Sequence, residues 1–300
     1  MSDRITNNQL HRTLLRNVYN SASRVLDARE KLSSGYEISR PSDDPLRATR
    51  SVALLSQTDS LKQYKSNLNQ ANAWSVTTES ALTQVVDLSR RARELVIAGA
   101  SDTMDPAARQ AIANEITGLI DSIKIQGNSK LGDDYIFAGS ASLTRPFALG
   151  ASDAFAGNTG AITREIAPGV QVDVNEVGSS VFGDSSSGLL ANLRTIVTHL
   201  TSGAPADLDL LRTTDLQQLD GNRATISAAV SRMGDMQNRF EFNLDRLAQL
   251  QETTGDLLSQ TRDTDIAKTS VDFATAQAAF EAALKTAQDV VTPTLVDFLK

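Results

Sequence analysis

The chain has 300 residues, 40% of them hydrophobic, and carries 29 lysines and arginines against 36 aspartates and glutamates, a formal net charge of −7. That length and composition supply enough apolar material for one or two folded domains. The acidic balance excludes a nucleic-acid binder that relies on a basic face. Because the sequence contains no cysteine, disulfides, thiolate metal sites, iron–sulfur clusters and cysteine nucleophiles are excluded as well.

Membrane and secretion signals are the next features to examine. No stretch approaches the roughly 18 to 20 uninterrupted apolar residues that span a membrane. Charged residues from Asp3 to Glu30 interrupt the first thirty positions, so a cleavable signal peptide, which needs about 7 to 15 apolar residues in a row, does not fit there. If the protein is exported, we expect it to leave by another route.

The N-terminal segment predicts an amphipathic helix. Residues at steps of three and four form a stripe that is apolar except for one arginine, and this spacing marks one face of a helix. The stripe consists of Leu15, Val18, Ala22, Val25, Arg29 and Leu32.

Two aspartate–proline pairs, Asp44-Pro45 and Asp105-Pro106, place a capping carboxylate before a proline and predict helices that begin at residues 45 and 106. The first helix carries a heptad seam over residues 54–96, in which nine of thirteen positions are apolar. The second is shorter and ends near Gly127-Asn128. It places on one face Ile112, Ile116, Leu119 and Ile123.

The middle of the chain is rich in turns, because ten of the 17 glycines fall within residues 127–188. Around residues 162–175 the apolar period changes to two, and Pro168-Gly169 separates the two alternating runs. This pattern predicts a β-hairpin.

The remainder of the chain is again predicted to be helical. A short helix with Leu189, Leu193, Ile196 and Leu200 ends at Gly203, and Pro205 begins a long returning helix. That helix carries a second heptad seam over residues 219–261, with nine of thirteen positions apolar. The last predicted helix has a stripe formed by Ile266, Ser270, Phe273, Gln277, Phe280, Leu284, Ala287 and Val291.

These elements predict a mainly α fold with a small β domain. We expect a long antiparallel helical coiled-coil rod, with the N- and C-terminal helices paired at one end and a β-hairpin-rich insert at the other. The expected domains are the terminal helices, 1–44 plus 262–300; the helical rod, 45–134 plus 188–261; and the small β domain, 135–187.

The terminal stripes have few intramolecular partners beyond each other. Since an isolated helix pair buries only one face, we expect the stripes either to be disordered in a monomer or to be buried between subunits. The predicted subunit-packing residues are Leu15, Val18, Val25, Leu32, Phe273, Phe280, Leu284 and Val291.

Candidate catalytic groups are few. We interpret His199 as a group near the carbonyls that end a short helix, and His11 as a surface residue. Asp43-Asp44 is interpreted as a helix cap and Asp133-Asp134 as a turn, while the run Arg90, Arg91 and Arg93 is expected to form a solvated or inter-subunit charged face. Phosphate-binding, dinucleotide-binding and nucleophile-elbow motifs are missing from the sequence. We therefore expect a non-enzymatic protein without cofactor, metal or catalytic residues.

Three segments together resemble the bacterial flagellin family. They are EKLSSGYEISRPSDDP at residues 30–45, NLNQANAWSVTTESALTQVVDLSRRARELVIAGAS at 67–101, and TRDTDIAKTSVDFATAQAAFEAALKTAQ at 261–288. Within the family, Pro41, Pro45, YIFAGS at 135–140 and residues 164–184 resemble the subunits at the junction between hook and filament more than filament flagellins. Residues 142–160 depart from the family pattern.

The resemblance implies a secreted structural adaptor of the extracellular flagellum, exported through the flagellar type III channel. Its implied partners are further copies of itself in a ring, the other hook-associated junction protein, flagellin, and a cytosolic export chaperone that binds Phe273, Phe280 and Leu284. It implies no binding of nucleic acid and no membrane insertion. Two alternatives stay open: a short flagellin that forms the filament itself, and an intracellular coiled-coil scaffold.

Overall fold

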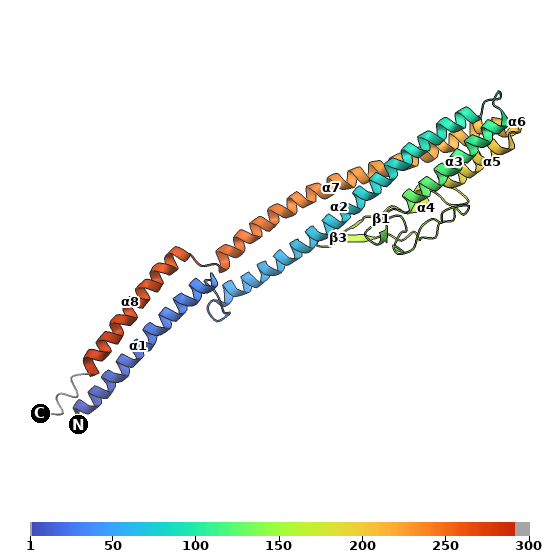
Figure 1. The fold of residues 1–300 in the computed structure, drawn as a ribbon. Helices are drawn as coiled ribbons and strands as arrows, with labels where there is room; N and C mark the ends of the chain where they lie inside the picture. Colours follow the sequence, from blue (N-terminus) through green and yellow to red (C-terminus); the bar gives the residue numbers. More distant parts are fainter. Residues whose placement is uncertain (1, 292–300) are drawn as a thin grey trace. The chain divides into compact units, whose positions relative to one another are not determined.

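The computed structural model describes residues 2–291, which are mainly helical with two small antiparallel sheets (Figure 1). The chain divides into two compact units, residues 1–60 with 250–300 (unit 1) and residues 61–249 (unit 2). This division falls inside two long helices, α2 (Pro45–Gly99) and α7 (Leu216–Arg262), which contribute to both units. The three-part division expected from the sequence stays a prediction.

The predicted helix boundaries are confirmed at both aspartate–proline pairs. α2 begins at Pro45, and Asp44 Oδ1 accepts hydrogen bonds from the backbone nitrogens of Leu46 and Arg47 at 3.1 and 3.0 Å. The helix α3 (Pro106–Gly127) begins in the same way, with Asp105 Oδ2 accepting from the nitrogen of Ala107 at 3.0 Å. The carboxylates satisfy amide groups that have no partner within the first helical turn.

The heptad seams of α2 and α7 meet in unit 2. Leu61, Leu68 and Ala71 of α2 are buried in one cluster with Phe240 and Leu247 of α7. Further along, Gln237 Nε2 donates to Glu79 at 2.7 Å. All predicted α2 seam positions from Leu61 to Val96 are buried apart from Tyr64, which is half-buried, so the seam is confirmed over these residues. Gln57 on α2 and Leu250 and Leu257 on α7 are exposed, so the predicted seams are wrong at these positions.

Two further helices complete the larger core of unit 2. α3 contributes Ile116, Ile120 and Ile123, and α5 (Gly188–Ser202) contributes Leu189, Leu193, Ile196 and Leu200. α3 and α5 lie beside α2 and α7 at the upper end of Figure 1. As predicted, α5 ends before Gly203, whose φ of 61° favours glycine because that backbone conformation strains other residues.

The returning helix is less regular than expected. Pro205 begins α6 (Pro205–Leu210), which continues through the π-helical segment η1 (Leu211–Asp215) into α7.

His199 Nδ1 lies 2.6 Å from Oδ2 of the buried Asp215. The side chain of His199 therefore pairs with a carboxylate on η1, which corrects the expectation that it would interact with the helix-terminal carbonyls. His11, expected on the surface, is half-buried on α1 (Ser2–Ser34).

The small sheets lie between α3 and α5 in the sequence. β1 (Lys130–Leu131) pairs with β2 (Asp134–Tyr135), and the predicted hairpin is confirmed as β3 (Thr163–Ala167) paired with β4 (Val170–Asp173). The predicted Asp133-Asp134 turn is confirmed in part, because Gly132, at φ 63°, and Asp133 form the turn while Asp134 begins β2. A four-residue helix, α4 (Gly178–Val181), follows the hairpin.

The hairpin packs along the side of two helices, whereas the sequence predicts it at the end of the rod opposite the terminal helices. Ile166 and Val174 are buried in the same cluster as Leu68 and Phe240, so the hairpin packs against the side of α2 and α7. The reason is the alternating pattern of the hairpin, which produces one apolar face that must be covered. In unit 2, the paired helices supply that cover.

Candidate subunit-packing surface

The terminal helices of unit 1 form a thin two-helix pair. α1 packs along α8 (Ile266–Val291), and the two ribbons run side by side in Figure 1. Among the side chains that the structure describes on these helices, only Ala28 and Thr269 are buried, and both remain slightly exposed. A pair that buries so little cannot satisfy its apolar residues by itself.

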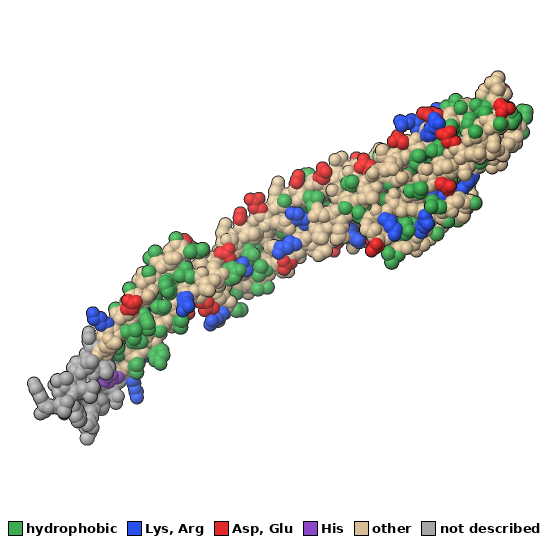
Figure 2. Space-filling view, in the orientation of Figure 1, with side chains coloured by type: hydrophobic (Ala, Val, Ile, Leu, Met, Phe, Trp, Pro, Cys, Tyr) green, Lys and Arg blue, Asp and Glu red, His purple; other side chains and the backbone are tan. Residues whose placement is uncertain are grey.

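Large hydrophobic side chains are exposed on this pair. The exposed fractions are 60% for Leu15, 74% for Tyr19 and 62% for Leu26 on α1, and 66% for Ile266 and 65% for Val271 on α8. Figure 2 shows hydrophobic side chains open to solvent along these helices. Exposed hydrophobic side chains grouped on a helix pair are typical of a protein interface.

The predicted packing residues fall into two groups. Exposed on the outer faces are Leu15 and Leu284, while half-buried in the pair are Val18, Val25, Leu32, Phe273 and Phe280. The side chain of Val291 lies outside the described residues. The stripe predicted on α8 is therefore wrong in part, because Ile266 and Leu284 are exposed. The less exposed face of α8 is formed instead by Thr269, Phe273, Ala276, Phe280, Ala283 and Ala287.

Sequence reasoning missed Tyr19, Leu26 and Val271, which are exposed on the same helices. A signal for the first two was present, because they follow Leu15 by four and eleven residues and so share one helical face with it. The single register drawn through Leu15 and Val18 mixed that outer face with the face that packs on α8.

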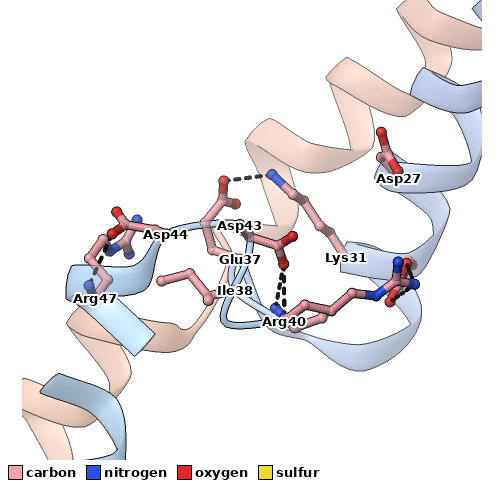
Figure 3. Close-up of a pocket in the computed structure, with 10 residues that line it drawn as sticks. Asp27, Lys31, Glu37, Ile38, Arg40, Asp43, Asp44 and Arg47 are labelled. Carbon is pink, nitrogen blue, oxygen red and sulfur yellow. Dashed lines mark hydrogen bonds and ion pairs between the residues drawn. The ribbon is translucent and has the colours of Figure 1, made fainter. Parts of the chain in front are cut away.

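The connection between α1 and α2 forms a polar depression beside this pair (Figure 3). Lys31 Nζ contacts Glu37 Oε1 at 2.7 Å, and Arg40 Nη2 contacts Glu30 at 3.2 Å. Asp43 Oδ2 accepts hydrogen bonds from the backbone nitrogens of Ser39 and Arg40. Since these charges satisfy one another or the backbone, the depression is better explained as a structural turn than as a ligand site.

The arginine run on α2 is paired within unit 2. Arg90 contacts Asp87 at 3.0 Å, Arg91 contacts Glu115 at 2.8 Å, and Arg93 contacts Asp220 at 2.9 Å. The hydrogen bond from Arg91 to Glu115 raises the pKa of Arg91 above its ordinary value. These exposed pairs form a charged face, and each contributes little to stability.

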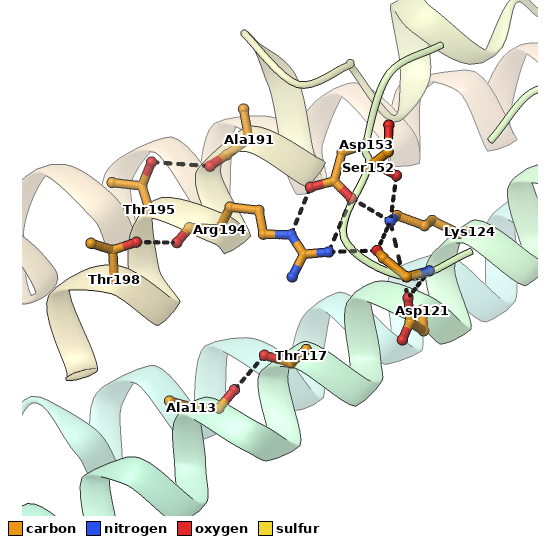
Figure 4. Close-up of polar contacts among 11 residues, drawn as sticks. Ala113, Thr117, Asp121, Lys124, Ser152, Asp153, Ala191, Arg194, Thr195 and Thr198 are labelled. Atoms are coloured by element: carbon orange, nitrogen blue, oxygen red, sulfur yellow. Dashed lines mark hydrogen bonds and ion pairs between the residues drawn. The ribbon is translucent and has the colours of Figure 1, made fainter. Parts of the chain in front are cut away.

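Unit 2 also contains a buried ionic cluster that sequence reasoning missed (Figure 4). Lys124, with a side chain 0% exposed, donates to the carbonyls of Gly150 and Ser152 at 2.6 and 2.8 Å and contacts Asp153. Arg194 Nε donates to Asp153 Oδ2 at 2.7 Å. Burial alone would raise the pKa of Asp153, but the hydrogen bonds from Arg194 and Lys124 outweigh it and lower that pKa.

The described part of the chain offers no other chemistry. Among residues 2–291, no group of histidine, aspartate and glutamate side chains is placed to hold a metal ion. In the same residues, no helix has the length and apolar character needed to cross a membrane. The exposed apolar faces of α1 and α8 are therefore the candidate functional surface.

A monomer with such a thin terminal pair is expected to open there first. Because α1 and α8 bury few side chains, we predict that backbone amides of residues 10–30 and 268–285 exchange with solvent at least tenfold faster than those of α3 in dilute solution. Hydrogen-exchange mass spectrometry checks this. Equal protection of the two regions at high dilution would contradict the claim that the pair needs neighbouring molecules.

The amino-acid sequence matches two regions of one protein family. Residues 5–142 match the bacterial flagellin N-terminal helical region, and residues 216–292 match the bacterial flagellin C-terminal helical region. The two regions correspond to the two helical flanks, and the segment between them contains the hairpin and α5.

Individual relatives include both a hook-associated protein and a flagellin. The chain is 25% identical over 189 residues to flagellar hook-associated protein 3 of Escherichia coli, covering 63% of this chain but only 59% of that relative. It is 27% identical over 261 residues to flagellin of Bacillus subtilis, covering 81% and 82% of the two chains.

The fold resembles that of a solved structure, flagellar hook-associated protein 3 from Legionella pneumophila. The TM-score is 0.62 at 13% identity, and the match covers 69% of this chain and 98% of that structure. At that identity, the likeness concerns the fold.

Proposed function

Because this chain belongs to the bacterial flagellin family, we propose that it is a structural subunit of the flagellum that assembles where the hook meets the filament. The observation that carries the proposal is the exposed apolar surface of α1 and α8, formed by Leu15, Tyr19, Leu26, Ile266 and Val271. A catalytic surface would gather polar and titratable groups, whereas this one needs covering by protein. The proposed role is accordingly mechanical and non-enzymatic.

In this role, copies of the chain pack side by side in a ring and bury their terminal helix pairs against one another. The ring joins the other hook-associated junction protein on one side to flagellin on the other. The protein is then an extracellular component of the flagellum, and it adapts a flexible hook to a stiffer filament. The similarity to hook-associated protein 3 of E. coli supports this position.

A cytosolic export chaperone is the proposed partner before assembly. Phe273, Phe280 and Leu284 are its proposed contacts. The two phenylalanines are half-buried against α1 in the folded pair, so a chaperone reaches them only when α8 is separate from α1. This fits a chain that is kept unfolded until it is secreted.

A short flagellin that forms the filament itself is the second candidate. It is favoured by the longer alignment to B. subtilis flagellin, which covers more of both chains than the alignment to hook-associated protein 3 does. An intracellular coiled-coil scaffold is the alternative of another class. It requires the α1 and α8 surface to be covered in the cytosol.

Deletion of the gene in the source bacterium tests the three functions. A junction subunit predicts loss of motility with intact flagellin shed into the growth medium, because filaments have nothing to attach to. A filament subunit predicts loss of motility with little flagellin in the medium. Immunoblots of medium and cells measure both outcomes, and re-expression of the gene is the control. Normal motility would contradict both flagellar functions.

A further inference from the structure

The helices of unit 1 are interrupted at two places that lie together. α1 ends at Ser34 and α7 ends at Arg262, and an isolated antiparallel bridge joins Tyr36 to Asp263. The nitrogen of Glu37 donates to the carbonyl of Arg262 at 2.7 Å, and the nitrogen of Thr264 donates to the carbonyl of Gly35 at 2.9 Å. We call the two connections, residues 35–44 and 263–265, the elbow.

One side chain of the first connection, that of Glu37, contacts both α1 and the second connection. Glu37 Oε1 accepts a hydrogen bond from Lys31 Nζ on α1 at 2.7 Å, and Glu37 Oε2 accepts one from Thr264 Oγ1 at 3.1 Å. Thr264 Oγ1 in turn lies 2.7 Å from Thr269 Oγ1 on α8. Glu37 therefore links the end of α1 to the start of α8 through its carboxylate, and to the end of α7 through its backbone.

The fourth helix at the elbow is held by a separate contact. Arg47, in the first turn of α2, donates from Nη2 and Nε to the carbonyl of Thr261 at 2.7 and 3.1 Å. This contact ties α2 to α7 without a hydrogen bond to Glu37, although the positive charge of Arg47 also helps to lower the pKa of the Glu37 carboxyl. Loss of Glu37 would free the α1 and α8 side of the elbow while the α2 and α7 side stays attached.

The charge of Glu37 is stabilised where it stands. The hydrogen bond from Lys31 lowers the pKa of Glu37 more than partial burial raises it. Its side chain and that of Lys31 are 39% and 36% exposed, so their contacts are weak enough to open without unfolding the helices. Contacts of this strength suit an element that opens and closes rather than a core.

We propose that Glu37 is the latch of the elbow. When its contacts to Lys31 and Thr264 are closed, the α1 and α8 pair is held in one orientation against the adjoining ends of α2 and α7. When they open, the pair swings as one body, because the Tyr36 bridge to Asp263 keeps the two connections together. The latch thus positions the apolar surface of α1 and α8, and its existence does not depend on the proposed function.

The absence of cysteine from the chain makes a direct test available, since spin labels introduced at new cysteines meet no background. Ser23 on α1 and Ser56 on α2 are exposed and lie in helices on either side of the elbow. In the S23C/S56C chain, electron–electron double resonance measures the distribution of distances between the two labels. We expect one narrow distribution for this chain.

Glu37→Gln in the labelled chain is expected to widen the distribution at least twofold, because an amide loses the charged contact to Lys31. Lys31→Met removes the same contact from the other side and should widen it as well. The matched control is Glu30→Gln, which removes an exposed carboxylate that pairs with Arg40 in the 35–44 connection but leaves the contacts of Glu37 with Lys31 and Thr264 in place. Its distribution should stay within 20% of the unsubstituted width.

Circular dichroism shows whether each variant keeps the helical content of the parent. If it does, a change in the distance distribution reflects a change of orientation at the elbow and not a loss of helix. The proposal is overturned if both Glu37→Gln and Lys31→Met leave the distribution unchanged, or if Glu30→Gln widens it equally. A variant that loses helix is replaced by Thr264→Val, which removes the hydroxyl donor and should also widen the distribution.

Discussion

Lys124→Met is expected to lower the free energy of unfolding of unit 2 by about 3 kcal/mol, the lower part of the range for breaking a buried ion pair. The substitution leaves Asp153, 5% exposed, with Arg194 as its remaining charged partner, and removes the donor from the carbonyls of Gly150 and Ser152. Urea unfolding followed by the fluorescence of Trp74 measures the change, because this sole tryptophan is buried in unit 2.

The control is Lys65→Met, which makes the same chemical change at an exposed position of α2 and should alter the free energy by less than about 0.5 kcal/mol. Equal effects of the two substitutions would contradict a structural role for the cluster.

The contribution of Asp153 to the stability of unit 2 depends on pH with a defined sign. Because the folded-state pKa of Asp153 is lowered, its contribution is complete at neutral pH and is lost as pH falls below about 4 through that pKa.

The double substitution Leu15→Asp with Tyr19→Asp is expected to abolish motility while leaving the monomer folded. Both side chains are exposed in the monomer, so the substitutions cost little before assembly. In an assembled ring, each aspartate would bury an unpaired carboxylate, at a cost of several kcal/mol per site. Swimming on soft agar and flagellin shed into the medium measure the outcome.

Phe242→Asp is the matched control, since Phe242 is 70% exposed but lies on α7 in unit 2. We expect it to retain motility. If the double variant swims normally, the α1 surface is not an assembly surface; if Phe242→Asp is equally defective, assembly is not confined to the terminal helices. Circular dichroism of each purified variant checks that the monomer keeps its helices.

Local chemistry made most of the fold predictable from sequence. Asp44 and Asp105 each act on amides two or three residues away, and the seams from Leu61 to Val96 repeat at a fixed helical spacing. Such signals depend on neighbours in sequence, so they can be recognised without knowledge of tertiary contacts. For the same reason, the hairpin around Gly169 could be predicted as a hairpin.

Tertiary placement could not be predicted in the same way. The hairpin's contact with Phe240 and the pairing of Lys124 with Asp153 join residues separated by many positions, and no periodicity encodes them. The packing surface was predicted on the right helices but in a mixed register, because several apolar residues on α1 point to different faces. Tyr19 and Leu26 lie outside the predicted stripe because a single stripe cannot follow both the outer face of α1 and the face that packs on α8.

The most direct test of the junction proposal is the location of the protein on the flagellum. Hook–basal bodies isolated from a strain of the source bacterium that lacks filament flagellin should carry the protein only at the distal end of each hook. Immunogold electron microscopy with an antibody against this chain measures this position. Hook ends without label, together with label along the filaments of the parent strain, would contradict the proposal and favour a filament subunit.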